Sequence, residues 1–367
     1  HAFATDPERG LFILGFLVVV IGGSLILFAI RAPALKSGGL FAPISREGSL
    51  VLNNLLLATA TATVLLGTLY PLLLDMATGE KVSVGPPFFQ ATFGPLMVPL
   101  VASVVIGPML PWKRGDLMGA LQRLRFAFFV SIGLAMAVWI FVAGGSWLST
   151  LGIALGVWLV AGSLAAIAER IKLLRVPLSQ SIQRAIHLPR STWGMTLAHS
   201  GLGVFLLGVT IVLTWQTESI QLMRQGDTAS IAGYELTFRG AGLVPGPNYT
   251  AERGMFSVTR NGESFATLLP EKRSYVSSSM TTTEAAIQPT WAGDLYAVIG
   301  EADGQGGWST RFFFKPFVHW LWIGAGIMVA GGLVSLTDRR HRVGAPARRK
   351  KAPAAVKPLA ASQLAGE

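Results

Sequence analysis

Residues 193–210 read Trp193-Gly-Met-Thr-Leu-Ala-His199-Ser-Gly-Leu-Gly-Val-Phe-Leu-Leu-Gly-Val-Thr210, an apolar run of membrane-spanning length that contains a histidine. Ionisable side chains are costly in hydrocarbon, so His199 is a candidate functional residue. A neutral imidazole keeps one nitrogen lone pair free and is a common axial ligand of haem iron. The plainer interpretation is a hydrogen bond to a neighbouring helix, and this stretch leaves both open. The small residues Gly201 and Gly203 would let a flat macrocycle or a second helix approach the backbone.

The composition is that of a polytopic membrane protein. The chain has 367 residues, of which 51% are hydrophobic and only 13% charged, whereas soluble domains carry about 25% charged residues. It has no cysteine, which excludes disulfides, thiolate metal sites and a thiol nucleophile. The sequence starts at His1 without a methionine or a signal-peptide pattern. We therefore expect a fragment or processed piece whose functional parts extend upstream.

Seven apolar runs are long enough to cross a bilayer, which takes about 20 apolar residues. The predicted spans are Gly10–Ile30, Leu50–Leu74, Phe93–Trp112, Leu124–Gly144, Trp147–Ala168, Gly194–Thr214 and Pro316–Leu336. Gly145 separates the fourth run from the fifth. Their combined length favours two spans over one re-entrant hairpin.

Lysine and arginine orient these spans. Four segments on one predicted side hold three, four, five and eight of them: Arg31–Gly48, Lys113–Arg125, Arg170–Ser191 and Asp338–Glu367. On the other side, Met76–Thr92 holds one and the Gly145–Ser146 turn none. Basic short loops stay in the cytoplasm, so His1 is predicted outside and the C-terminus inside. The net charge of +11 is then a topology signal. We expect the basic tail to touch anionic lipid headgroups and expect no nucleic-acid partner.

Trp215–Phe313 differs from the rest of the chain in being polar, with ten acidic residues against seven lysines and arginines. Alternating patterns predict five short strands, which are Tyr234–Arg239, Gly254–Arg260, Ser264–Leu269, Asp294–Gly300 and Ser309–Phe314. Asn261-Gly262 is typical of a type I′ hairpin turn. The fold class predicted is a mainly α polytopic membrane protein of seven transmembrane helices. A small antiparallel β-domain, with a barrel as one form, is inserted between helices six and seven.

The predicted domains follow from these segments. Residues 1–215 form a six-helix membrane region, 216–313 a periplasmic β-domain, 314–337 the last transmembrane helix and 338–367 a basic cytoplasmic tail. We find no catalytic triad and no Walker, dinucleotide-binding or zinc motif. No residue is therefore predicted to be catalytic.

The other histidines divide by position. His1 lies outside, nine residues before the first span, where a haem at the surface could reach it. His187 and His341 lie in basic segments and are predicted to be solvated. His319 stands beside Trp320 near the outer end of the last span, which is typical of an interfacial aromatic belt, with a ligand role as the alternative.

Two further motifs lie in and around the second span. Asn53-Asn54 places two amides inside it, which we interpret as hydrogen bonds to neighbouring helices, with a functional role as the alternative. Val84-Gly-Pro-Pro-Phe-Phe89 lies in the following outer loop. A rigid Pro-Pro turn with exposed aromatic rings would cradle an apolar ligand or lie along the membrane surface.

Several of these motifs, in this order, resemble the C-terminal half of the CcmF family, membrane proteins of cytochrome c maturation. The segments that carry the resemblance are His1-Ala-Phe-Ala-Thr-Asp-Pro-Glu-Arg-Gly10, Asn53-Asn54, Gly67-Thr-Leu-Tyr-Pro71, Val84–Phe89, Leu188-Pro-Arg-Ser-Thr-Trp-Gly-Met-Thr-Leu-Ala-His199, Thr283-Glu-Ala-Ala-Ile287 and Asp294-Leu-Tyr296. The resemblance covers nearly the whole chain. The family's Trp-rich segment, of the WGGxWxWD type, is absent and is expected upstream.

The resemblance implies the site and the function. His199 would be the second transmembrane histidine, an axial ligand of a resident haem b, and His1 the second periplasmic histidine, a ligand of haem in transit. The first histidine of each pair would lie upstream, so this piece would hold half of each site. The family takes haem from a periplasmic haem chaperone and joins its vinyl groups to the CxxCH thiols of apocytochrome c, working with other cytochrome c maturation subunits.

We therefore expect a multi-pass protein of the bacterial inner membrane that is part of a cytochrome c haem lyase, not complete in this piece. Two alternatives come from other classes of protein. One is a transporter of haem or another small molecule, although the spans hold almost no charge and the halves show no repeat symmetry. The other is a scaffold that docks haem-maturation partners without doing chemistry.

Overall fold

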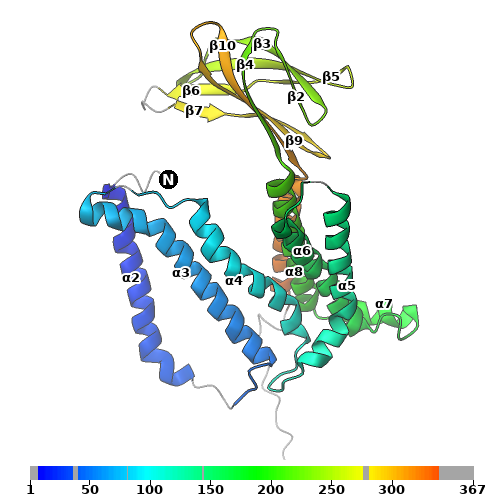
Figure 1. The fold of residues 1–367 in the computed structure, drawn as a ribbon. Coiled ribbons are helices and arrows are strands. Elements are labelled where there is room, and N and C mark those ends of the chain that lie inside the picture. Colours follow the sequence, from blue (N-terminus) through cyan, green and yellow to red (C-terminus); the bar gives the residue numbers. More distant parts are fainter. Residues whose placement is uncertain (1–6, 36–39, 81, 143, 276–280, 339–367) are drawn as a thin grey trace, which may run out of the picture.

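The computed structural model describes residues 7–35, 40–80, 82–142, 144–275 and 281–338. A bundle of long helices carries a β-domain at one end (Figure 1). In the described ranges, seven helices are long and apolar enough to cross a membrane, and the β-domain joins the sixth to the seventh. The predicted fold class is confirmed.

The helices in chain order are α2 (Pro7–Arg31), η1 (Ala32–Leu35), α3 (Arg46–Thr78), α4 (Pro86–Ile106), η2 (Gly107–Met109), α5 (Leu117–Phe141), α6 (Trp147–Ile171), α7 (Leu178–Ile186), α8 (Arg190–Trp215) and α9 (His319–Leu336). Their ends differ most from the predicted spans at α4 and α5, which begin at 86 and 117 instead of 93 and 124. The reason is local. Pro86 and Pro87 suit a first helical turn, and the Asp116 carboxylate accepts the Gly119 N–H and caps α5.

The fourth and fifth spans are separate helices, as predicted. Ser146 begins α6 with a capping box, in which the Ser146 and Ser149 hydroxyls each accept the other residue's backbone N–H. The third span ends earlier than predicted, because Pro108 lacks an N–H and α4 passes into the short η2 turn. That turn forms part of the cavity described below.

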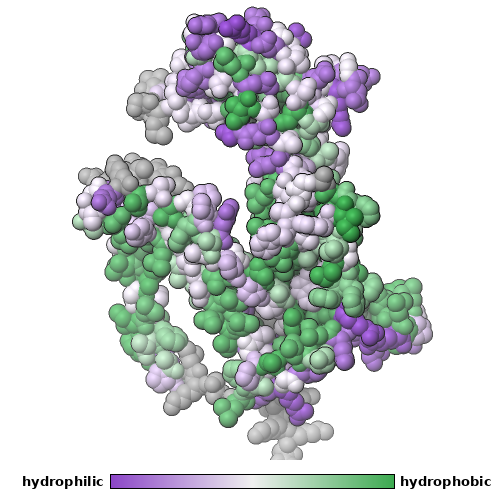
Figure 2. Space-filling model, in the orientation of Figure 1, coloured by the Kyte–Doolittle hydropathy of each residue, from purple (hydrophilic) through white to green (hydrophobic). Residues whose placement is uncertain are grey.

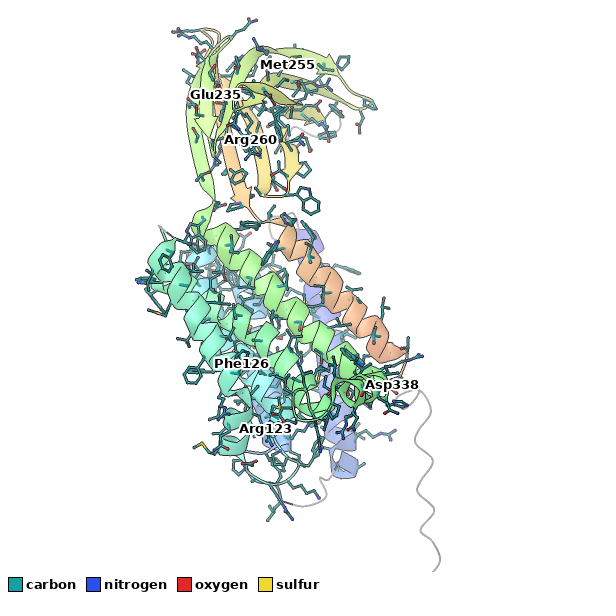
Figure 3. The ribbon with its side chains drawn as sticks, turned by 90° about the vertical axis from the view of Figure 1, so that its right-hand side faces the viewer. Arg123, Phe126, Glu235, Met255, Arg260 and Asp338 are labelled. Atoms are coloured by element: carbon teal, nitrogen blue, oxygen red, sulfur yellow. The ribbon has the colours of Figure 1, made fainter. Side chains whose placement is uncertain are left out.

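Helices α8 and α9 form the most extensive helix contact and run antiparallel side by side (Figure 3). A methyl group on Gly194 would lie 2.5 Å from the carbonyl oxygen of Gly331, and one on Gly201 would lie 2.7 Å from that of Gly324. On each helix the two glycines are seven residues apart, so they recur on one face. Hydrogen there lets the two backbones touch, which is how helices associate in membranes.

The pair is tied at its far end. The Asp338 carboxylate, six per cent exposed and labelled in Figure 3, accepts the Ser191 N–H at 3.0 Å. Ser191 lies in the first turn of α8, where free N–H groups and the helix dipole favour an anion. Asp338, two residues after α9, is thereby held against the start of α8.

The first three helices are more open. Apolar side chains of α2 such as Phe12 and Val19 are more than 70% exposed. Figure 2 shows the helices covered with hydrophobic residues, while hydrophilic ones gather on the β-domain and around α7. The large apolar side chains of these helices therefore face out of the described bundle.

The β-domain consists of two packed antiparallel sheets. One has the order β1-β10-β9-β8 and the other β2-β3-β4-β6-β7, with β5 paired to β4. The strands are β1 (Thr217–Arg224), β2 (Thr228–Ile231), β3 (Tyr234–Pro245), β4 (Tyr249–Arg260), β5 (Glu263–Leu268), β6 (Glu271–Tyr275), β7 (Thr281–Glu284), β8 (Ala286–Thr290), β9 (Gly293–Ala302) and β10 (Gly307–Pro316). The five predicted strands correspond to β3, β4, β5, β9 and β10. The core between the sheets includes Phe238, Phe256 and Phe312, each at most 1% exposed.

The predicted hairpin turn is also confirmed. Asn261 and Gly262, between β4 and β5, have φ of 53° and 81°, the two positive values that a type I′ turn requires. The end of the β-domain differs from the predicted boundary at 313, because β10 continues to Pro316 and α9 starts at His319. The hydrogen bonds of the β10 ladder hold these last residues in the sheet.

Short links place the β-domain on the α8–α9 pair. Only Gln216 separates α8 from β1, and β10 reaches α9 through Phe317 and Val318. Strands β1 and β10 are themselves paired, from Thr217 opposite Phe314 outward. The antiparallel helix pair thus continues directly into an antiparallel strand pair.

Candidate functional site

His199 lies on α8, nine residues after its start at Arg190, or about 14 Å along the helix at 1.5 Å per residue. Because the helix begins at 190 and not at 194 as predicted, the histidine lies four residues further from the helix start than the sequence indicated. Lysines and arginines cluster at the end of the bundle where α8 starts. We call it the basic end, and it lies opposite the β-domain (Figure 1).

The imidazole forms part of the wall of a cavity of about 280 Å³. The other walls are the first turns of α3, including Arg46 and Asn53, the end of α4 with η2, and Met195 on α8. His199 is half-buried, and within the described part of the chain neither ring nitrogen has a hydrogen-bond partner. The plainer interpretation, a histidine bonded to a neighbouring helix, is therefore not what the structure shows. A nitrogen lone pair remains free beside an open space.

A second, smaller gap also borders His199. It measures about 10 Å³ and is bordered by His199, Thr196 on α8 and Ser163 on α6. The Ser163 hydroxyl is buried without a hydrogen-bond partner, while Thr196 donates to the Thr192 carbonyl at 3.0 Å. The gap is about the size of one water molecule. His199 thus borders both the larger cavity and this small gap with polar side chains.

The glycines near His199 serve helix packing. A methyl group on Gly203 would lie 2.8 Å from the Gly156 carbonyl oxygen on α6, and Gly201 faces α9 as described above. Gly201 and Gly203 were expected to admit either a macrocycle or a second helix, and in the structure each is in contact with a second helix. The open space beside His199 comes instead from α3 and α4.

The amides of Asn53 and Asn54 were expected to bond neighbouring helices. That expectation is wrong, since the Asn53 Nδ2 donates to the Asn54 Oδ1 at 3.4 Å on the same helix. Asn53 lines the cavity with His199. Its one hydrogen-bond partner among the described residues is thus Asn54, its neighbour in the chain.

The aromatic motif at residues 84–89 was expected to be an outer loop. Pro86–Phe89 instead form the first turn of α4. The Phe88 and Phe89 rings cross Gly67 on α3, where a methyl group would lie 2.6 Å and 3.0 Å from them. Two motifs of the sequence thus meet in one α3–α4 contact, and their shared role is packing.

The remaining histidines are not brought to this cavity. His187 is exposed after α7, with its Nδ1 2.6 Å from the Gln183 carbonyl oxygen. His319 starts α9 with its ring centroid 6.4 Å from that of Trp291 and 6.2 Å from that of Phe317, an aromatic setting that agrees with the predicted belt. His1 and His341 lie outside the described residues.

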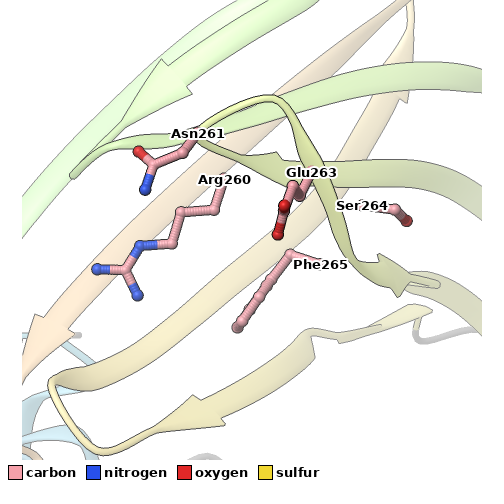
Figure 4. Close-up of a pocket in the computed structure, with 5 residues that line it drawn as sticks. All are labelled: Arg260, Asn261, Glu263, Ser264 and Phe265. Atoms are coloured by element: carbon pink, nitrogen blue, oxygen red, sulfur yellow. The ribbon is translucent and has the colours of Figure 1, made fainter.

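The β-domain has an open pocket at the β4–β5 hairpin, lined by Arg260, Asn261, Glu263, Ser264 and Phe265 (Figure 4). The Arg260 guanidinium lies 5.0 Å from the Tyr234 ring centroid, so it covers the edge of the core. Within the described residues there is no group of three or more His, Cys, Asp or Glu side chains able to hold a metal ion. The His199 cavity is therefore the better candidate for a cofactor site.

Fold and site together define a class: a multi-pass membrane protein with a β-sandwich at one end and a free histidine at a cavity among its helices. Residues 214–316 match a family model described as the CcmF C-terminal beta-sandwich. The chain is 50% identical over 346 residues to the cytochrome c-type biogenesis protein CycK of Bradyrhizobium diazoefficiens, covering 94% of this chain and 52% of that protein. It is 38% identical over 343 residues to the cytochrome c-type biogenesis protein CcmF of Escherichia coli, covering 93% and 51%.

A solved structure named Cytochrome c Heme Lyase CcmF shares the fold, with a TM-score of 0.68 and 22% identity over 90% of this chain and 50% of that one. The chain belongs to the CcmF family of cytochrome c-type biogenesis proteins. It spans about half the length of the relatives it matches.

Proposed function

We propose that this chain is the haem-holding part of a cytochrome c haem lyase, with His199 as an axial ligand of a resident haem b. The observation that carries the proposal is the unpaired imidazole at a cavity within the membrane-spanning helices. Its relatives are named cytochrome c-type biogenesis proteins and a structural neighbour is named a haem lyase, which supports haem as the ligand.

The residues present suit such a group. A haem needs a ligand nitrogen and largely apolar walls, and Leu50, Val104 and Met195 supply such walls around His199. When bound, haem iron supplies one-electron redox chemistry. The chain's own part is to offer the lone pair, exclude water and hold the imidazole orientation. A water in the small gap that His199 shares with Ser163 and Thr196 would serve the last of these.

We further propose that His1 ligates the haem awaiting attachment, at a second site on the β-domain side of the membrane. The Pro7 end of α2 lies at the same end of the bundle as the β-domain (Figure 1), and the basic end lies opposite, which supports a periplasmic β-domain and a cytoplasmic C-terminus. Because the chain has no cysteine, both thioether sulfurs come from the CxxCH motif of apocytochrome c. A periplasmic haem chaperone and other maturation subunits complete the set of partners.

Paired variants in the full-length protein test both sites. His199→Ala should lose the b-type absorption bands of the purified protein, because no other described histidine lines the cavity, and added imidazole should restore them. His187→Ala is the matched control and should keep them, since its ring is exposed and remote. Full retention of the bands with an unchanged reduction potential in His199→Ala would reject the assignment.

The second member of the pair is His1→Ala. It should abolish covalent cytochrome c formation while leaving the b-type spectrum intact, because the two histidines serve separate haems. The two-site proposal fails if maturation proceeds normally in this variant, or if the b-type haem is lost with it.

A further inference from the structure

The cavity has a polar stripe that the haem-ligand assignment of His199 does not use. Arg46, Ser49, Leu50 and Asn53, all on α3, line it opposite His199. Their spacing of three, four and seven residues puts them on one face of the helix. Polar groups in membrane-spanning helices are costly unless they meet a partner. Three of the four residues on this face are polar, so the face is suited to a ligand with polar groups.

Arg46 is the charged end of the stripe. Its guanidinium carbon lies 4.8 Å from the centroid of the Trp112 ring, which holds the side chain at the basic end of the cavity. Within the described residues Arg46 has no carboxylate partner. The nearby acids are engaged elsewhere: Glu47 accepts the Lys113 N–H at 2.7 Å and Asp116 caps α5.

A second cation adds to the positive charge at the basic end. Arg170 on α6 interacts electrostatically with Arg46, and its own hydrogen bond, at 3.5 Å, goes to the neutral Thr192 hydroxyl. Neither guanidinium forms an ion pair with a carboxylate of the described residues, so the two like charges create a positive potential near this end of the cavity. An anion placed there relieves the repulsion.

We propose that Arg46 binds the propionate carboxylates of the porphyrin whose iron His199 ligates, so that the cavity selects a metalloporphyrin with free carboxylates; this rests on the proposed function. The planar guanidinium matches a carboxylate in a two-point contact. Asn53, about 10 Å further along α3 at helical rise, also lines the cavity. Arg46 would hold the carboxylates at the basic end, where charge costs least, and Leu50, Val104 and Met195 would contact apolar parts of the group.

The proposal assigns Arg46 a role that packing alone would not give it. An arginine that only lies on Trp112 would not distinguish a free carboxylate from an ester. Its replacement by a neutral side chain of similar length would then leave the relative affinities for haem and ester unchanged. Both properties can be measured without assaying cytochrome c maturation.

The test uses full-length protein in detergent, stripped of haem and titrated with haem or with haem dimethyl ester. Wild type should bind haem about tenfold or more tighter than the ester, as expected for a charged hydrogen bond. Arg46→Gln should bind both equally and should have a lower reduction potential, because a positive charge near the iron is gone. Arg46→Lys should retain part of the preference. Arg184→Gln, which removes an exposed arginine of α7 at the same end, is the matched control and should behave like wild type.

Each outcome separates the two proposals. If His199→Ala loses the haem while Arg46→Gln matches the control in potential and ester discrimination, the carboxylate assignment is wrong and the haem site stands. If His199→Ala keeps its haem, the haem site itself is wrong. If Arg46→Gln does not accumulate, equal binding of acid and ester by wild type alone overturns the assignment.

Discussion

The β-sandwich and the helix bundle bury opposite kinds of side chain. The sandwich encloses large rings such as Phe238, Phe256 and Phe312, at most 1% exposed. The bundle places glycines at its closest contacts, Gly194 against Gly331 and Gly201 against Gly324, and turns its large apolar residues outward. In water, apolar burial drives packing. In lipid that force vanishes between helices, and close backbone approach takes its place.

A similar contrast exists within α8 alone. One face is filled by α9 and another by α6, at Gly201 and Gly203 respectively. The face that carries His199 is left open to a cavity. The close packing on two sides fixes the helix, and this gives the half-buried histidine a defined position although its ring has no hydrogen bond.

The largest effect is expected at the glycine contact. Gly324→Leu should prevent accumulation of monodisperse protein, since even its Cβ would lie 2.4 Å from the Phe205 backbone nitrogen and 2.7 Å from the Gly201 carbonyl oxygen, and backbone cannot yield as side chains do. Size-exclusion chromatography in detergent measures the amount of monodisperse protein. Gly326→Leu on the same helix has no atom within 4 Å and should behave like wild type. Equal profiles for the two variants would show that the α8–α9 contact is not needed.

An intermediate effect is expected in the sandwich at Glu271, which is six per cent exposed. Its carboxylate accepts hydrogen bonds from the Arg253 and Arg273 Nε groups at 2.6 Å and 2.7 Å. Glu271→Gln should destabilise an excised polypeptide of residues 214–316 by about 1.5–3 kcal/mol, the usual contribution of a hydrogen bond to a charged group. Urea unfolding at pH 7 measures it.

The same carboxylate gives the sandwich a pH dependence. The hydrogen bond from Arg273, followed by that from Arg253, lowers the pKa of Glu271. A lowered pKa means that the stabilisation is complete above the ordinary glutamate value of about 4.3 and is lost as the pH falls through the lower folded-state value. The wild-type polypeptide should therefore lose more stability than Glu271→Gln on acidification below about pH 4. Parallel losses in the two would contradict this assignment.

The smallest effect is expected at the β4–β5 turn. Gly262→Ala should cost the sandwich about 1 kcal/mol, because the residue has φ of 81°, where a Cβ is disfavoured although no atom lies within 4 Å. Gly242→Ala, at a strand position with equally open space and ordinary backbone, is the control. The measurement is the urea unfolding midpoint of each variant. If the two midpoints coincide, the turn tolerates another conformation.

The strands that the sequence pattern predicted are those with regular alternation, such as β9, where Leu295, Ala297 and Ile299 are fully buried. The strands that it missed lack this signal. β6 (Glu271–Tyr275) turns a glutamate inward because two arginines neutralise it, and β2 (Thr228–Ile231) is only four residues long. Composition alone cannot show that a charge is paired across a sheet.

The same limit applies to the site. The apolar surroundings of His199 marked it as a candidate, and the family resemblance assigned it a ligand. Asn53 was wrongly predicted to bond a neighbouring helix, and Phe88 was wrongly predicted to lie in an exposed loop. Both outcomes depend on where the other helices lie. Arg46 was not selected at all, since its place in the cavity depends on α3, α4 and α8 meeting there.

From the sequence come the seven spans, the inserted β-domain and the hairpin at Asn261-Gly262, because length, hydropathy and backbone preference are local properties that no neighbour overrides. Only the folded chain shows which glycines meet, which face of α8 stays open and which polar residues share the cavity with His199. These depend on contacts between segments far apart in the chain, such as Arg46 and His199. The distances between such residues, and which of their polar groups lack a hydrogen-bond partner, are decided only when the helices pack.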